Sequence, residues 1–159
     1  SQSRIFSMSL AHKMMYEHNN FEFLNISEYI KEITESAFNN YENNQLDELN
    51  FTSDNILINV EQAQAVGYIV HELALNSIKH AWNKDSNKML TINIQKQNNN
   101  IKLTYKDNGK GLPDDFNIET VSSMGLKLVR SFTKRQLKGT INFLSDNGTT
   151  IILSFKPRT

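Results

Sequence analysis

Two parts of the chain alternate apolar and polar residues with a period of two, and this pattern constrains the fold more than any other feature. In the first part, strands are predicted at 89–97 and 101–107, joined by an asparagine-rich turn. In the second, strands predicted at 140–145 and 149–156 flank Asp146-Asn147-Gly148, a strong hairpin-turn signal. Because successive side chains of a strand point to opposite faces, each pair is expected to form an antiparallel hairpin with one apolar face.

Apolar residues spaced three and four positions apart predict the helices that cover this face, at 3–17, 61–82 and 124–138. Asn25 and Glu28 have the spacing of a capping box, so a further helix is expected to begin after Asn25. Gly139 is predicted to cap the C-terminus of helix 124–138. In the first helix the predicted apolar stripe consists of Ile5, Met8, Ala11 and Met15, with Phe6, Leu10 and Met14 beside it.

Further short strands are predicted around 21–24, 49–52 and 56–58. Helices and strands that alternate in this order predict an α+β fold with two layers. The expected architecture is a mixed, mostly antiparallel sheet with helices on one face.

The helix at 61–82 carries an unusual polar stripe within an otherwise apolar segment. Glu72, Asn76, Lys79 and His80 are spaced i, i+4, i+7 and i+8, which places them on one face of an α-helix. Polar groups on a buried face are costly unless something satisfies them, and a ligand with a metal ion and phosphates would do so. The amide oxygen of Asn76 suits Mg²⁺, which takes few protein ligands.

Three glycine-containing segments follow the polar stripe in the chain: Asp107-Asn108-Gly109-Lys110-Gly111, Ser123-Met124-Gly125-Leu126 and Gly148-Thr149. The common nucleotide motifs do not fit them. No Gly-Lys-Ser or Gly-Lys-Thr is present, which excludes a P-loop, and the first segment lacks the third glycine of a dinucleotide fingerprint. A zinc-protease helix is excluded because Leu75 stands where the second histidine is required.

The stripe and the three segments, in this order, resemble the four boxes of the Bergerat-fold ATPase superfamily, which includes gyrase, Hsp90, histidine kinases and MutL. The resemblance covers residues ~25–157. It implies an ATP site in which Asp107 accepts a hydrogen bond from the adenine amino group, Asn76 binds Mg²⁺ and Glu72 acts as the catalytic base. Its remaining implied ligand-binding residues are Lys79, His80, Gly109, Gly111, Gly125, Leu126 and Thr149.

Within that superfamily, Glu72 to Ala81 and Gly125 to Val129 look most like the catalytic domain of a sensor histidine kinase with an atypical phosphoacceptor domain. The helix at 3–17 resembles the last helix of the dimerisation and phosphoacceptor hairpin in that group. The resemblance therefore implies two parts, 1–20 from the hairpin and 21–159 as the catalytic domain. The chain begins inside a helix, so we expect a fragment whose acceptor histidine lies elsewhere, and His12 is expected to pack rather than accept phosphate.

Several roles stay open at this level. Lys79 is expected either to contact phosphate or to be a solvated lysine, and His80 either to contact phosphate or to cap the helix. His71 is expected either to pack or to support a site residue without touching the ligand, and Phe116 either to replace a missing lid motif or to anchor the loop at 112–122. The alternatives for the whole chain are an anti-sigma-type serine kinase, a gyrase-like hydrolase and a non-catalytic nucleotide-binding scaffold.

Composition limits the partners. Lysine plus arginine equals aspartate plus glutamate at 17 each, which argues against general binding to nucleic acid or a membrane surface. No cysteine is present, so disulfides and thiolate metal sites are excluded. No apolar run approaches the length of a transmembrane helix. The resemblance implies a cytoplasmic domain, a homodimer in the full-length protein and, as partners, its own phosphoacceptor domain and the receiver domain of a response regulator.

Overall fold

The computed structural model describes residues 2–40 and 45–158, and its central element is a five-stranded sheet in the order β2-β4-β5-β7-β6. The β2–β4 pair is parallel and the other pairs are antiparallel, as the sequence predicts for a mixed, mostly antiparallel sheet. The strands are β2 (Glu48–Ser53), β4 (Met89–Gln97), β5 (Asn100–Asp107), β6 (Thr140–Ser145) and β7 (Thr149–Phe155).

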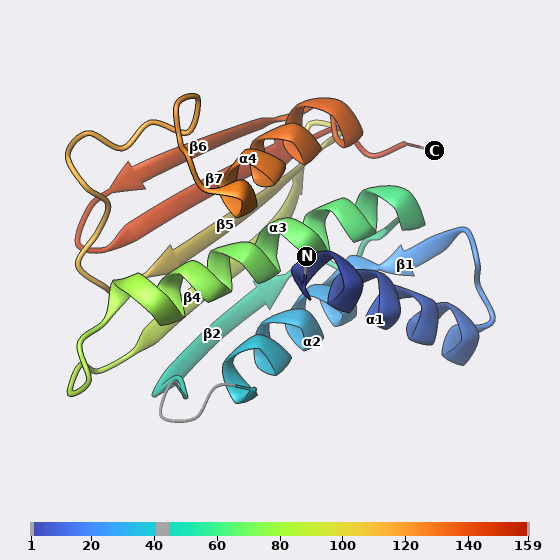
Figure 1. Cartoon of the computed structure of the whole chain (residues 1–159). Helices are drawn as coiled ribbons and strands as arrows, with labels where there is room; N and C mark the ends of the chain where they lie inside the picture. The colour runs from blue at the N-terminus through green and yellow to red at the C-terminus, as the bar shows by residue number, and fades with distance from the viewer. Residues whose placement is uncertain (1, 41–44, 159) are drawn as a thin grey trace.

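α2, α3 and α4 cover one face of this sheet, as the sequence predicts, and α1 packs against α2 and α3 (Figure 1). Two of them end in a π-helical turn, η1 after α3 and η2 after α4. A second small sheet joins β1 (Phe23–Asn25) and β3 (Leu57–Asn59) beside the helices. The helical segments are α1 (Gln2–His18), α2 (Ile26–Asn39), α3 (Val60–Asn76), η1 (Ser77–Ala81), α4 (Met124–Ser131) and η2 (Phe132–Gln136).

The predicted start of α2 directly after Asn25 is confirmed, with Asn25 as its N-cap. The Asn25 side chain accepts a hydrogen bond from the backbone N–H of Glu28 at 3.2 Å, which satisfies one of the unpaired donors of the first turn. The apolar stripe that follows packs into the core, where Ile26, Tyr29 and Ile30 have no exposed surface. Among residues 2–40 and 45–158, no helix is both long enough and apolar enough to cross a membrane.

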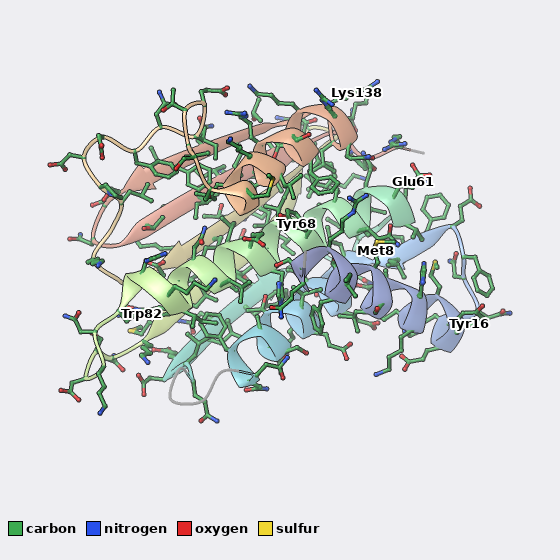
Figure 2. All side chains as sticks on the ribbon, in the orientation of Figure 1. Met8, Tyr16, Glu61, Tyr68, Trp82 and Lys138 are labelled. Atoms are coloured by element: carbon green, nitrogen blue, oxygen red, sulfur yellow. The ribbon has the colours of Figure 1, made fainter. Side chains whose placement is uncertain are left out.

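The predicted core face of α1 is partly wrong. Ile5 is 68% exposed and Met8 is 40% exposed, and Tyr16, at the outer end of α1 in Figure 2, is 76% exposed. The buried residues of α1 include Ala11 of the predicted stripe and Leu10 and Met14 beside it, together with Ser3 and Ser7, which were not predicted. Hydropathy misplaces the buried face of α1 because small residues let this helix pack closely against α2 and α3. A backbone carbonyl is also satisfied across this contact, since the Tyr29 hydroxyl donates to the Ser7 carbonyl at 2.7 Å.

The predicted glycine cap after α4 is also wrong. Lys138, not Gly139, has the positive φ, at 50°. A glycine is required at position 139 for a different reason: a Cβ there would collide with the backbone carbonyl of Ser154 in β7. The glycine therefore allows the chain to pass close to the sheet before it enters β6.

Candidate functional site

A cavity of about 560 Å³ opens between the C-terminal end of the α3–η1 helix, the loop that follows β5, and the strands β6 and β7. Residues from separate parts of the sequence meet there because β5 and β7 are neighbours in the sheet and α3 lies across them (Figure 1). Its lining residues are Leu73, Asn76, Ser77, His80, Ala81, Asp107, Lys110, Gly111, Leu112, Pro113, Phe116, Ser123, Leu126, Phe143, Thr149 and Ile151.

Asp107 is the most constrained charged group of the cavity. Its side chain is at the end of β5 and only 3% exposed. One carboxylate oxygen accepts from the backbone N–H groups of Gly109 and Thr149, at 3.0 and 3.1 Å, and the other accepts from the Ser77 hydroxyl at 2.8 Å. These three bonds fix the carboxylate and compensate the cost of burying its charge.

Ser77 and Tyr105 form a hydrogen-bond network with Asp107 that was not predicted from the sequence. The Ser77 and Tyr105 hydroxyls are 2.9 Å apart, and both residues are buried. Complete burial raises the pKa of Tyr105 above its usual range, so its hydroxyl keeps its proton. Since the Ser77 hydroxyl proton goes to Asp107, the Tyr105 hydroxyl must donate to Ser77. The available signal was the spacing of Tyr105 and Asp107, two apart on one face of β5.

The predicted glycines allow close approaches around the aspartate. A Cβ on Gly109 would collide with the carbonyl of Ala81, which accepts a hydrogen bond from the Lys110 N–H at 2.9 Å. Gly111 has φ +85°, a conformation that residues with a side chain rarely adopt, and it lines the cavity. The loop after β5 is thereby tied to the end of the helix.

The polar stripe is divided by the π-helical turn. Glu72 and Asn76 lie on α3, whereas Lys79 and His80 lie in η1. A π-turn changes the angular spacing of its residues, so positions that would align in an α-helix no longer do. Asn76 and His80 line the cavity, but Lys79 is exposed and outside its lining, where Lys110 is present instead. The phosphate role of Lys79 therefore stays a prediction without support from this geometry.

The N-terminus of α4 closes another side of the cavity. Ser123 caps the helix by accepting from the Leu126 N–H at 3.3 Å, and both residues line the cavity. Gly125 lies directly against Glu72, because a Cβ on Gly125 would be 2.9 Å from the Glu72 carboxyl carbon. Glu72 and Gly125 are thus neighbours at the cavity's edge, outside its lining, and the free N–H groups of the first helical turn favour an anion nearby.

The loop from 112 to 122 covers the cavity and is held at several points. The Phe116 ring lies 5.0 Å from the Phe143 ring of β6, so Phe116 anchors the loop. Arg130 of α4 donates to the carbonyl of Ile118 at 3.2 Å and to that of Glu119. Lys134 pairs with Glu119 at 2.8 Å, and this hydrogen bond lowers the pKa of the Glu119 carboxyl.

Asn76 is the residue that best fits a metal ion here. Among residues 2–40 and 45–158 its side chain has no hydrogen-bond partner in the protein, and no group of three or more histidine, aspartate and glutamate residues could hold a metal. A single amide oxygen fits Mg²⁺, which completes its shell with water and phosphate oxygens. The cavity thus offers a buried carboxylate for an amino group and apolar walls for a flat ring. Asn76 and the N-terminal turn of α4 also line it and could bind a metal ion and an anion.

Comparison with protein families gives two matches. A sequence model of the family described as "Histidine kinase-, DNA gyrase B-, and HSP90-like ATPase" matches residues 61–159. A second model, described as "Histidine kinase", matches residues 1–41, which include α1 and α2.

Curated relatives include the sensor histidine kinase PdtaS of Mycobacterium tuberculosis, which is 27% identical over 108 residues, or 66% of this chain. Another is the blue-light-activated histidine kinase 2 of Erythrobacter litoralis, which is 23% identical over 100 residues, or 62% of this chain. The matched segments are 22% and 29% of the length of these relatives, so the chain corresponds to a minor part of each.

Solved structures share the fold. The histidine kinase domain of an Erythrobacter litoralis blue-light activated histidine kinase superposes with a TM-score of 0.85 at 18% identity, over 98% of this chain and 74% of that one. The ATP binding domain of PrrB from Mycobacterium tuberculosis gives a TM-score of 0.67 at 17% identity, over 87% of this chain and 98% of that one.

Proposed function

The chain belongs to the histidine kinase-, DNA gyrase B- and HSP90-like ATPase family, and on that premise we propose that it binds Mg·ATP and transfers the γ-phosphoryl group to a histidine of a sensor histidine kinase. The observation that carries this proposal is the buried Asp107 carboxylate at the base of a cavity that also reaches the N-terminus of a helix.

Asp107 favours adenine over guanine. A carboxylate only accepts hydrogen bonds, so it pairs with the exocyclic amino group of adenine. Guanine presents a carbonyl oxygen at the equivalent ring position, and two acceptors facing each other in a buried site repel. The apolar side chains of Leu73, Phe143 and Ile151, which line the same cavity, suit the faces and edges of a purine.

The phosphates would then extend toward α4. The N-terminal turn at Gly125 and Leu126 offers backbone N–H groups, and His80 and Lys110 add polar contacts from the opposite side. Asn76 would hold Mg²⁺, which when bound neutralises charge on the phosphate oxygens. Glu72 lies one helical turn before Asn76 and beside Gly125, so its carboxylate would accept a hydrogen bond or proton from the attacking group.

The rest of the proposal concerns the whole protein. We assign residues 1–20 to the end of a dimerisation and phosphoacceptor hairpin and residues 21–159 to the catalytic domain. The match of residues 1–41 to a histidine kinase model supports a hairpin segment near the N-terminus. We further propose that the full-length protein is a homodimer and that it passes the phosphoryl group to the receiver domain of a response regulator. The domain would lie in the cytoplasm, where it has access to ATP.

The first experiment measures ATP and GTP binding by calorimetry in the presence of Mg²⁺. We expect ATP to bind more tightly than GTP, and Asp107→Asn to weaken ATP binding about 10- to 100-fold, because a hydrogen bond to a charged group is worth roughly 1.5–3 kcal/mol. Asp146→Asn, in the exposed turn between β6 and β7, is the matched control and should leave the affinity unchanged. Equal affinities of wild type and Asp107→Asn would contradict the adenine assignment.

The second experiment follows radiolabelled γ-phosphate in the full-length protein, which includes the acceptor. We expect an acid-labile phosphohistidine in the wild type and, in Glu72→Gln, unchanged ATP affinity with transfer slowed about 10²- to 10⁴-fold. Acid-stable phosphoserine on a separate protein would instead indicate a serine kinase, and release of free phosphate alone a hydrolase. Binding without either product would indicate a scaffold.

A further inference from the structure

The first turn of α1 makes a specific polar contact with α3 at the residue that the proposed function treats as catalytic. The Ser3 hydroxyl oxygen is 2.8 Å from Oε1 of Glu72 and 2.6 Å from Nδ1 of His71. Ser3 is 1% exposed and His71 is 7% exposed, so solvent has little access to the contact between them. One hydroxyl therefore bridges two neighbouring side chains of another helix.

The protons of this bridge can be assigned by counting donors. A serine hydroxyl has one proton, and an ionised carboxylate can only accept. Ser3 therefore donates to Glu72 and must accept from His71, which places a proton on Nδ1 of the imidazole. Burial lowers the pKa of His71, so the ring is neutral at physiological pH and its Nε2 carries no proton. The result is a directed chain from His71 through Ser3 to Glu72.

The contacts on either side restrict the same carboxylate. Oε2 of Glu72 faces Gly125 in the first turn of α4, where even a Cβ would not fit. The Phe6 ring of α1 lies 4.9 Å from the His71 ring, which limits rotation of the imidazole. Glu72 is thus held between α1, through one oxygen, and α4, through the other.

We propose that Ser3 and His71 are positioning residues that fix the Glu72 carboxylate for phosphoryl transfer. The inference rests on the proposed function, because the orientation of Glu72 affects a reaction only if Glu72 takes part in it. Neither residue lines the cavity, so neither is expected to contribute to ATP binding. Their effect is on the geometry of a group that must point at the attacking atom, where a displacement of about 1 Å can slow a reaction 10²-fold.

The structural part is tested by NMR of the 159-residue chain with ¹⁵N-labelled histidine. We expect the two ring nitrogens of His71 at neutral pH to show a proton fixed on Nδ1. In Ser3→Ala this preference should be lost, because the hydroxyl that accepts from Nδ1 is gone. Ser7→Ala is the matched control: Ser7 is equally buried, one turn further along α1, and among the residues that the structure describes its hydroxyl bonds only to the Arg4 carbonyl of its own helix, at 3.1 Å. A wild-type proton on Nε2 would overturn the assignment.

The functional part uses the phosphotransfer assay in the full-length protein. We expect Ser3→Ala to lower the transfer rate at saturating ATP about 10- to 100-fold with unchanged KM for ATP. Ser3→Thr, which keeps the hydroxyl, should restore most of the rate, and His71→Asn, whose amide N–H lies near the Nδ1 position, should be less impaired than His71→Phe. A wild-type rate in Ser3→Ala, or an effect on KM alone, would overturn the proposal.

The two failures are distinguishable. If the wild-type protein forms no phosphohistidine, the proposed function is wrong, and the role of the bridge in transfer is wrong with it. If the wild type is active and Glu72→Gln is not, but Ser3→Ala behaves as wild type, only the positioning role is wrong. Thermal unfolding of each variant identifies any loss of rate that comes from loss of folded protein.

Discussion

Removal of the Ser77 hydroxyl tests the hydrogen-bond network beneath Asp107. In Ser77→Ala, the Asp107 carboxylate loses one of three donors, and the buried Tyr105 hydroxyl loses its acceptor. The first loss is worth roughly 1.5–3 kcal/mol, because the acceptor is charged, and an unsatisfied buried hydroxyl costs about 1–3 kcal/mol. Since the cavity that an alanine leaves is small, we expect the free energy of unfolding to fall by about 2.5–6 kcal/mol, the sum of the two losses.

The double variant Ser77→Ala/Tyr105→Phe separates the two contributions. With the phenol hydroxyl removed as well, no buried donor is left without an acceptor, so the double variant should be more stable than Ser77→Ala by about 1–3 kcal/mol. Tyr105→Phe alone should cost roughly 0.5–1.5 kcal/mol, the value of an ordinary hydrogen bond. Independent effects would instead make the double variant less stable than Ser77→Ala.

Urea unfolding of the four proteins, followed by circular dichroism, measures these differences if the m-values stay equal. Calorimetry adds a functional readout, because Ser77→Ala should weaken ATP binding while Asp107 keeps its two backbone donors. A double variant that is less stable than Ser77→Ala by the full cost of Tyr105→Phe would refute the network.

Three further outcomes follow from the geometry. Gly148→Ala should lower the free energy of unfolding by about 1–3 kcal/mol or more, measured in urea, because φ is +123° and the new Cβ collides with the Asp107 carbonyl. Arg130→Ala should increase amide hydrogen exchange across 112–122 and speed nucleotide release, while exchange in β5 stays unchanged. Folding lowers the pKa of His71, so near and below the usual value of about 6.5 the unfolded chain binds more protons than the folded chain. The free energy of unfolding should therefore decrease as the pH falls from 7 to 5. In pH-dependent unfolding, His71→Asn should make that decrease smaller.

The strands and the α2 cap could be predicted from sequence because they depend on local interactions. Period-two alternation predicted β4 and β5 to within about one residue, and the Asn98 and Asn99 turn has the positive φ values expected of a tight hairpin. The face of α1 could not be predicted in this way. Its buried surface is chosen by how closely Ser3 and Ser7 let it approach α3 and α2, which is a property of packing.

The candidate site was predicted in part, because local sequence patterns locate its segments whereas packing decides which side chains meet. The order of the glycine segments led to Asp107, Gly111, Leu126 and Thr149, which do line the cavity. The prediction for Lys79 and His80 assumed an uninterrupted α-helix. In the structure both residues lie in the π-turn η1, and Lys79 is outside the cavity lining. Ser77 was overlooked because its role depends on Tyr105 and Asp107, about 30 residues away in the chain.

The parallel pairing of β2 with β4 has a consequence for the order in which the chain folds. Glu48 of β2 aligns with Met89 of β4, and the whole of α3 lies between them, so this edge of the sheet forms only after a long loop has closed. The hairpins β4–β5 and β6–β7 close over a few residues and need no such search. We therefore expect β2 to pair with β4 only after the β4–β5 hairpin has formed, and its hydrogen exchange protection during refolding should appear after that of β4 and β5.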